Sequence, residues 1–176
     1  MSGNLFQFGP NSLGNLSSTV AGAYRAMIHE PPVQPVAQAA SLQQLFSAHQ
    51  QLLDGLARLE TETAKSVPDK AAVRAARLAL SQASRKRSTI LDSVLASEAR
   101  IRTGPDLLQL VALQDSVRRA RTASTAHVAR WSQSALEADW RGYCRDSALM
   151  RRHMRRQIKA ETKFFVQSSG SGRGHG

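Results

Sequence analysis

The sequence predicts an all-α protein, an antiparallel up-down-up-down four-helix bundle with disordered N- and C-terminal tails. Three observations predict this fold. Leucine and alanine recur at spacings of three and four residues in four long stretches, which is the period of an amphipathic helix. Aromatic residues make up only 5% of the 176 residues, which is fewer than a strand-rich fold favours. The connections between the four stretches are short, so antiparallel neighbours are their simplest arrangement.

The two ends of the chain lack a sustained apolar face. Residues 1–38 are rich in Gly, Asn, Ser, Pro and Gln, and three prolines interrupt any continuous helix there: Pro31, Pro32 and Pro35. Residues 168–176 read SSGSGRGHG, which is typical of a flexible tail. We therefore expect one domain at 39–167, preceded by a flexible segment at 1–38.

The first two predicted helices each carry an apolar stripe that is interrupted by one polar residue. The stripe of the first helix, residues 39–63, is Leu42, Leu45, Phe46, His49, Leu52, Leu53, Leu56 and Leu59. The stripe of the second helix, residues 69–102, is Val73, Ala76, Leu80, Ala83, Leu91, Val94, Leu95, Glu98 and Ile101. The middle of the second helix, residues 84–88, is polar and is its least regular part.

The third and fourth predicted helices have recognisable starts. Gly104 ends the second helix and Pro105 takes the first position of the third, residues 105–131, which are favoured placements for both. The stripe of the third helix is Leu107, Leu110, Val111, Gln114, Val117, Arg121, Val128 and Trp131. The fourth helix, residues 135–166, follows Ser134, whose spacing to Glu137 is that of a capping box. Its stripe is Leu136, Trp140, Tyr143, Ser147, Met150, Met154, Ile158, Glu161 and Phe165.

Polar residues on these stripes are the candidates for chemistry. His49, Glu98 and Glu161 lie on the apolar stripes of three different helices, and His127 lies on the flank of its helix. Carboxylates are rarely buried without a cation or a metal, and bundles build metal sites from facing helices. One interpretation is therefore a site for iron or another divalent metal. The alternative is a histidine with a local hydrogen bond and carboxylates that reach water or pair with an arginine.

Several segments resemble bacterial hemerythrin-like (HHE cation-binding) proteins. Residues 131–165, WSQSALEADWRGYCRDSALMRRHMRRQIKAETKFF, resemble the last helix of that family. Residues 48–59, AHQQLLDGLARL, resemble its first helix, which opens with a ligand histidine. Residues 95–98, LASE, are similar to its second-helix motif His-Leu-Ala-x-Glu. The resemblance spans about residues 42–166 and implies the bundle fold, with His49, Glu98 and Glu161 as the ligands that remain.

The departures from the family pattern fall on the metal ligands. Val94 stands where the family has a histidine four residues before Glu98, and Gln157 stands in the same relation to Glu161. Valine offers no lone pair and glutamine offers only a weak amide oxygen. The carboxylate that often follows is Thr162 here. The resemblance therefore implies a reduced or lost metal centre, in a metal-binding, sensing or regulatory domain that binds one divalent ion weakly or none.

The charge of the chain predicts a second, metal-free function. Residues 70–163 contain 20 Lys and Arg against 8 Asp and Glu, which leaves a net charge of +12. Six cations lie along one face of the fourth helix: Arg141, Arg145, Arg152, Arg156, Lys159 and Lys163. Such a stripe is either a solvated face or a contact for an acidic protein, a membrane surface or nucleic acid. Contacts to nucleic acid would be nonspecific, because the sequence has no helix-turn-helix, finger or aromatic stacking platform.

The remaining function classes lack their motifs. The sequence contains no Gly-rich phosphate loop, no nucleophile elbow and no metalloprotease motif, so we do not expect an enzyme. It has no run of about 18 apolar residues, and its N-terminus does not show the pattern of a secretory signal. The single Cys144 excludes an intramolecular disulfide and fits a reducing compartment, so we expect a cytoplasmic protein.

Overall fold

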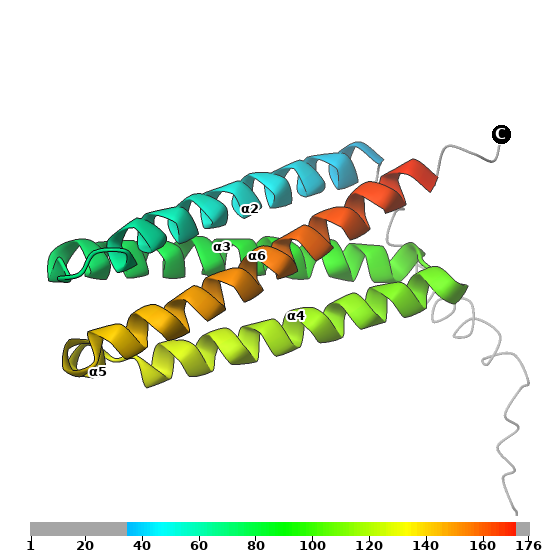
Figure 1. Ribbon diagram of the computed structural model, residues 1–176. Helices are drawn as coiled ribbons and strands as arrows, with labels where there is room; N and C mark the ends of the chain where they lie inside the picture. Colours follow the sequence, from blue (N-terminus) through cyan, green and yellow to red (C-terminus); the bar gives the residue numbers. More distant parts are fainter. Residues whose placement is uncertain (1–34, 172–176) are drawn as a thin grey trace, which may run out of the picture. The chain divides into compact units, whose positions relative to one another are not determined.

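The structure, a computed structural model, describes residues 35–171, with side chains from 36 to 167. Within that range the chain forms helices and no strand (Figure 1). The helices are α2 (Pro35–Thr63), α3 (Lys70–Ile101), α4 (Gly104–Arg130), α5 (Gln133–Ala138) and α6 (Trp140–Ser171). The all-α prediction is confirmed for these residues. The predictions for residues 1–34 and 172–176 lie outside the described part.

Each of the four long helices packs on two of the others. Helix α3 packs along α2 and meets α4, while α6 packs on both α2 and α4. Six residues connect α2 to α3 and two connect α3 to α4, so consecutive helices return as neighbours (Figure 1). The short helix α5 contacts α6. None of the described helices has an apolar stretch long enough to cross a membrane.

The local sequence accounts for where the helices begin. Asp69 caps α3, because its side chain accepts a hydrogen bond of 3.0 Å from the backbone N–H of Ala72. Gly104 has a φ of 55°, a left-handed conformation that favours glycine, and Pro105 follows at the start of α4. Helix α2 begins at Pro35, four residues before the predicted start, because proline is tolerated at the first position of a helix.

The prediction of a single fourth helix at 135–166 is wrong at its N-terminal end, and at the other end α6 continues to Ser171, into the predicted tail at 168–176. At the N-terminal end the chain forms α5 and α6, separated at Asp139, whose backbone leaves the helical region with φ −138° and ψ 74°. The Asp139 side chain accepts a hydrogen bond of 2.8 Å from the backbone N–H of Gly142, so it caps the start of α6. The cap of α5 is Ser132, not the predicted Ser134, because Ser132 accepts from the backbone N–H of Ala135.

The apolar side chains form three clusters at different levels along the helices. The largest joins all four long helices and consists of Leu45, Leu91, Val94, Leu95, Leu110, Leu113, Val117 and Phe165. A second, smaller cluster is Leu52, Leu56 and Ile158. A third surrounds α5 and consists of Val73, Trp131, Leu136 and Tyr143. Gly55 lets α2 approach α3 closely, because a Cβ there would lie 3.1 Å from Leu80 Cδ1.

Two leucines of α4 provide a matched test of this core. Leu110 is fully buried in the largest cluster, whereas Leu108 is 71% exposed. We expect Leu110→Ala to lower the free energy of unfolding by about 2–5 kcal/mol, and Leu108→Ala to change it by less than about 0.5 kcal/mol. Urea denaturation of both variants measures the difference. Equal losses would mean that α4 is rotated about its axis relative to this structure.

Candidate functional site

A buried carboxylate, Glu161 of α6, lies between the long helices. Its side chain is fully buried, yet both of its oxygens have partners. Oε1 accepts from the guanidinium of Arg87 on α3 in a buried ion pair. Oε2 lies 2.9 Å from His49 Nε2 on α2. The carboxylate therefore joins three helices, and the charge that balances it is a guanidinium.

The hydrogen bond to Glu161 also orients the imidazole of His49. An ionised carboxylate only accepts hydrogen bonds, so Nε2 of His49 carries the proton that it donates. The other ring nitrogen, Nδ1, lies 3.2 Å from the hydroxyl of Thr162, which donates to it when the ring is neutral. Both nitrogens of this buried ring are thus partnered, and both partners lie on α6 rather than next to His49 in the sequence.

Helix α4 also joins this hydrogen-bond network, through Gln157 of α6. The Ser116 hydroxyl of α4 donates to Gln157 Oε1 over 2.7 Å, and Gln157 Nε2 donates to Glu161 Oε1 over 2.9 Å. We call the connected residues the polar layer: His49, Arg87, Ser116, Gln157, Glu161 and Thr162. All four long helices therefore contribute to one hydrogen-bond network.

Glu98 lies in a different environment from Glu161. Its Oε1 accepts a hydrogen bond of 2.7 Å from Gln38 Nε2 of α2. Its Oε2 accepts from Arg102 Nε, also over 2.7 Å, and the two side chains form an ion pair. Both predicted carboxylates, Glu98 and Glu161, are buried, and each of them pairs with an arginine.

The fourth predicted ligand, His127, is also apart from the polar layer. It is half-buried on α4, where its ring stacks on Tyr143 of α6 with 6.2 Å between centroids. Burial lowers the pKa of His127, Asp146 raises it, and three guanidinium groups lower it further: Arg77, Arg130 and Arg151. The ring is therefore neutral at pH 7.

The residues of the polar layer do not fit a di-iron centre or a similar metal site. Within residues 36–167, no three His, Cys, Asp or Glu side chains lie close enough to hold a metal ion together. The structure brings His49 and Glu161 together but leaves Glu98 and His127 elsewhere. A cation at Glu161 would also meet the positive charge of Arg87, and both carboxylate oxygens are already engaged.

The sequence predicted neither Ser116 nor Arg87 as a member of the polar layer, and of the two it is Arg87 that brings a charge. It stands seven residues after Leu80 and four before Leu91, so it lies on the apolar stripe of α3. The structure places it in the interior with 7% exposure, beside the carboxylate that needs a cation. Its stripe spacing was a usable signal, but it falls in the polar segment 84–88, where the period is hard to follow.

The six cations that the sequence predicted on one face of the fourth helix are exposed on α6. They lie within an arc of about 60° at about 100° per residue, and they extend over roughly 33 Å. We call them the basic stripe: Arg141, Arg145, Arg152, Arg156, Lys159 and Lys163. None of the six makes an ion pair or side-chain hydrogen bond with another described residue. Their charges are therefore available to a partner.

The two acidic residues of α6 do not balance the basic stripe. Glu161 is buried in the polar layer. Asp146 accepts a hydrogen bond of 3.1 Å from Trp131 Nε1 and pairs with Arg130 of α4 over 3.0 Å. The exposed side of α6 is thus a positively charged surface.

The pKa of Glu161 makes the stability of the protein depend on pH. Burial raises its pKa, but the hydrogen bonds and charge of His49, Arg87 and Gln157 outweigh burial and hold it below the ordinary 4.5. A carboxyl group whose pKa is lower in the folded than in the unfolded protein stabilises the folded state at pH values above its pKa in the unfolded chain. This contribution is lost as the pH falls through the pKa of the group in the folded protein.

We expect Glu161→Gln to lower the free energy of unfolding by about 3–5 kcal/mol at pH 7, because it leaves the Arg87 charge buried and unpaired. The difference from the wild type should begin to shrink as the pH falls below 4.5, where the carboxyl group of the unfolded chain takes up a proton, and it should be smallest once the pH is below the folded pKa. Urea denaturation at several pH values measures both effects. Glu137→Gln, which changes an exposed carboxylate, is the control and should change little. A loss that is the same at every pH would contradict the assignment.

Comparison with known proteins adds no relative. No family model, no curated protein and no solved structure matches the chain. The resemblance to hemerythrin-like proteins therefore stays a prediction from the sequence. A function for this chain must therefore be inferred from the geometry of the polar layer and of the basic stripe.

Proposed function

We propose that the chain is a metal-free helical binding module that contacts the phosphate backbone of nucleic acid through the basic stripe of α6. The observation that carries this proposal is the row of six exposed cations that have no ion-pair partner among the described residues. Of the two functions that the sequence predicts, the geometry favours this one over a metal-binding domain. Arg87 balances the buried charge of Glu161, whereas the cations of the basic stripe have no counter-charge in the part of the chain that the structure describes.

The proposal includes the antiparallel up-down-up-down bundle for α2, α3, α4 and α6. The short connections and the packing of each long helix on two others support this order. The hemerythrin-like resemblance implies the same arrangement, with the polar layer here in place of the metal centre. In such a bundle α6 buries one side, and the opposite side remains open along its whole length.

Phosphates suit the basic stripe better than an acidic protein does. Protein interfaces have a centre that is rich in apolar and aromatic residues and poor in charge. The exposed large apolar side chains on α6 are only two within the described residues, Leu149 and Val166. Four of the six cations are arginines, whose planar guanidinium binds phosphate oxygens in pairs.

The basic face extends beyond α6 onto α4. Arg119 of α4 lines a groove of about 450 Å³ together with His153 and Arg156 of α6. Both Arg119 and His153 are exposed. A strand of nucleic acid that follows the stripe therefore meets further donors on the neighbouring helix.

Binding of a mixed-sequence DNA duplex at increasing salt tests the proposal. If all six cations contact phosphates, the logarithm of the binding constant should fall against the logarithm of salt with a slope of about −5. The double substitution Arg145→Gln with Arg152→Gln should weaken binding to every sequence and reduce the slope by about 2. Fluorescence anisotropy of a labelled duplex measures both quantities.

The matched control removes the same charge elsewhere. Arg58 on α2 and Arg74 on α3 are exposed and have no ion pair with a described residue. The double substitution Arg58→Gln with Arg74→Gln should leave the slope unchanged. An equal loss in the control would show that net charge, not the stripe, causes binding. Binding to polyglutamate but not to DNA would also refute the proposal.

A further inference from the structure

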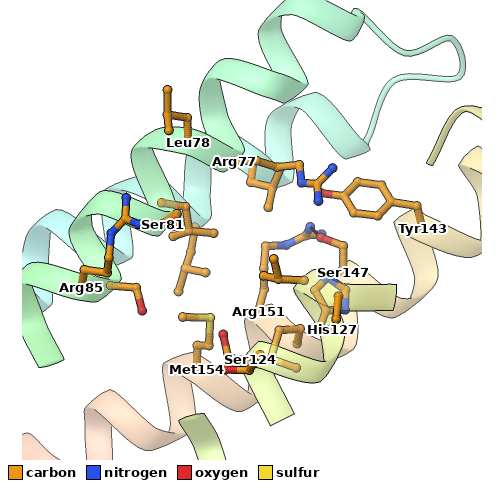
Figure 2. A pocket seen from close by; sticks show the side chains of 18 residues that line it. Arg77, Leu78, Ser81, Arg85, Ser124, His127, Tyr143, Ser147, Arg151 and Met154 are labelled. Atoms are coloured by element: carbon orange, nitrogen blue, oxygen red, sulfur yellow. Dashed lines mark hydrogen bonds between the residues drawn. The ribbon is translucent and has the colours of Figure 1, made fainter. Parts of the chain in front are cut away.

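A cavity of about 580 Å³ lies between the N-terminal half of α3 and the C-terminal half of α4, beside α6 (Figure 2). Its volume falls within the range of about 300–1,000 Å³ that is usual for small-molecule sites. The side chains that line it within the described chain include three arginines and no carboxylate. Of the three, only Arg151 is buried, and a charged group is rarely buried unless it is paired.

Arg151 of α6 is the most deeply buried of the three arginines. Arg151 is 5% exposed. The charge of the Glu60 carboxylate acts on it, but Glu60 forms its ion pair with Arg155, and Arg151 has no ion pair with a described residue. Nη1 donates to Ser147 Oγ over 2.8 Å, whereas Nε has no hydrogen-bond partner there. Burial lowers the pKa of Arg151, yet a guanidinium stays protonated in proteins. A buried, unpaired charge of this kind is costly unless an anion joins it.

Other donors surround the same end of the cavity. Figure 2 shows Arg77 of α3 and His127 of α4 near Tyr143, Ser147 and Arg151 of α6. The Arg77 guanidinium lies 5.5 Å from the centre of the Tyr143 ring and donates to the backbone carbonyl of Trp131. Two guanidinium groups therefore lie at this end of the cavity, beside two hydroxyl-bearing side chains.

The rest of the cavity wall is largely apolar. The contributing side chains come from α2, α3, α4 and α6: Leu56, Leu59, Leu78, Leu80, Val128, Met150 and Met154. Methionine adapts its shape to different apolar groups. A ligand with one anionic end and an apolar body would pair with Arg151 and bury its body against this wall.

We propose that this cavity binds a small amphipathic organic anion, with a carboxylate or phosphate head at Arg151 and an apolar chain along the leucines and methionines. Arginine binds both head groups with paired hydrogen bonds. The cavity lies on the buried side of α6, opposite the basic stripe. The proposal is therefore independent of nucleic-acid binding and goes beyond it.

Isothermal titration calorimetry with four probes that each carry a ten-carbon chain tests the proposal on the full protein. We expect one decanoate or one decyl phosphate per chain, and the tighter of the two identifies the head group. Binding of 1-decanol and of decyltrimethylammonium should be at least about tenfold weaker, since neither supplies an anion. Equal binding of decanol would overturn the proposal.

Two substitutions locate the site. Arg151→Met keeps much of the side-chain volume and should weaken binding of the anion by at least about tenfold. Arg74→Met removes an exposed arginine of α3 and should leave binding unchanged. Ser124→Phe places a larger side chain on the α4 wall of the cavity and should also weaken binding. Wild-type affinity in Arg151→Met or in Ser124→Phe would overturn the proposal.

The stability of the ligand-free variant separates a binding role of Arg151 from a structural one. Arg151→Met removes an unpaired buried charge, so its unfolding temperature without ligand should equal or exceed that of the wild type. A lower unfolding temperature would show that Arg151 is needed for packing and would contradict the proposal. The Arg145→Gln with Arg152→Gln variant should bind decanoate normally, which keeps this test separate from that of DNA binding.

Discussion

The ion pair between Arg87 and Glu161 is the interaction on which the interior of this protein depends. A carboxylate at this depth is stable only with a cation and with hydrogen bonds to its remaining lone pairs. Arg87 of α3 supplies the charge, while His49 of α2 and Gln157 of α6 supply the hydrogen bonds. Because Gln157 is also held by Ser116 of α4, the pair links all four long helices at one level. Sliding any of these helices along its axis would break at least one of these contacts.

The two sides of α6 show how a chain with many more basic than acidic residues distributes its positive charge. On the buried side, Glu161 neutralises Arg87. On the exposed side, the basic stripe is left without counter-charges from the described chain. Arg151 is the exception, because it is buried and the described chain gives it neither a paired carboxylate nor a hydrogen-bond partner for Nε. The basic stripe and the cavity at Arg151 lie on opposite sides of α6, so they can bind different ligands.

The spacing of apolar residues at three and four positions predicted the helices that pack through apolar stripes. Leu45, Leu91 and Leu110 were placed on inward faces from spacing alone, and the structure buries all three. The split between α5 and α6 was not predicted. The side chain of Asp139 stabilises the break between α5 and α6, although the helical spacing of apolar residues continues across it.

The candidate site was predicted in part. His49 and Glu161 were identified because each interrupts an apolar stripe, and the structure joins them over 2.9 Å. The partner Arg87 was missed, because three consecutive basic residues resemble a solvated face in the sequence. Glu98 pairs with Arg102 four residues later at the end of the same helix, a spacing that is visible in the sequence. The pairing of Glu161 with Arg87 instead depends on the relative heights of α6 and α3. One sequence does not specify those heights.

The central claim is that a guanidinium, not a metal ion, balances the buried charge of Glu161. Elemental analysis of the untagged chain after loading with iron and extensive dialysis tests this claim most directly. The account predicts far less than one metal ion per chain and no absorption band of an oxo-bridged iron pair, because both carboxylate oxygens are engaged by Arg87 and His49. Two iron ions per chain with that absorption would contradict it and would support a hemerythrin-like metal centre.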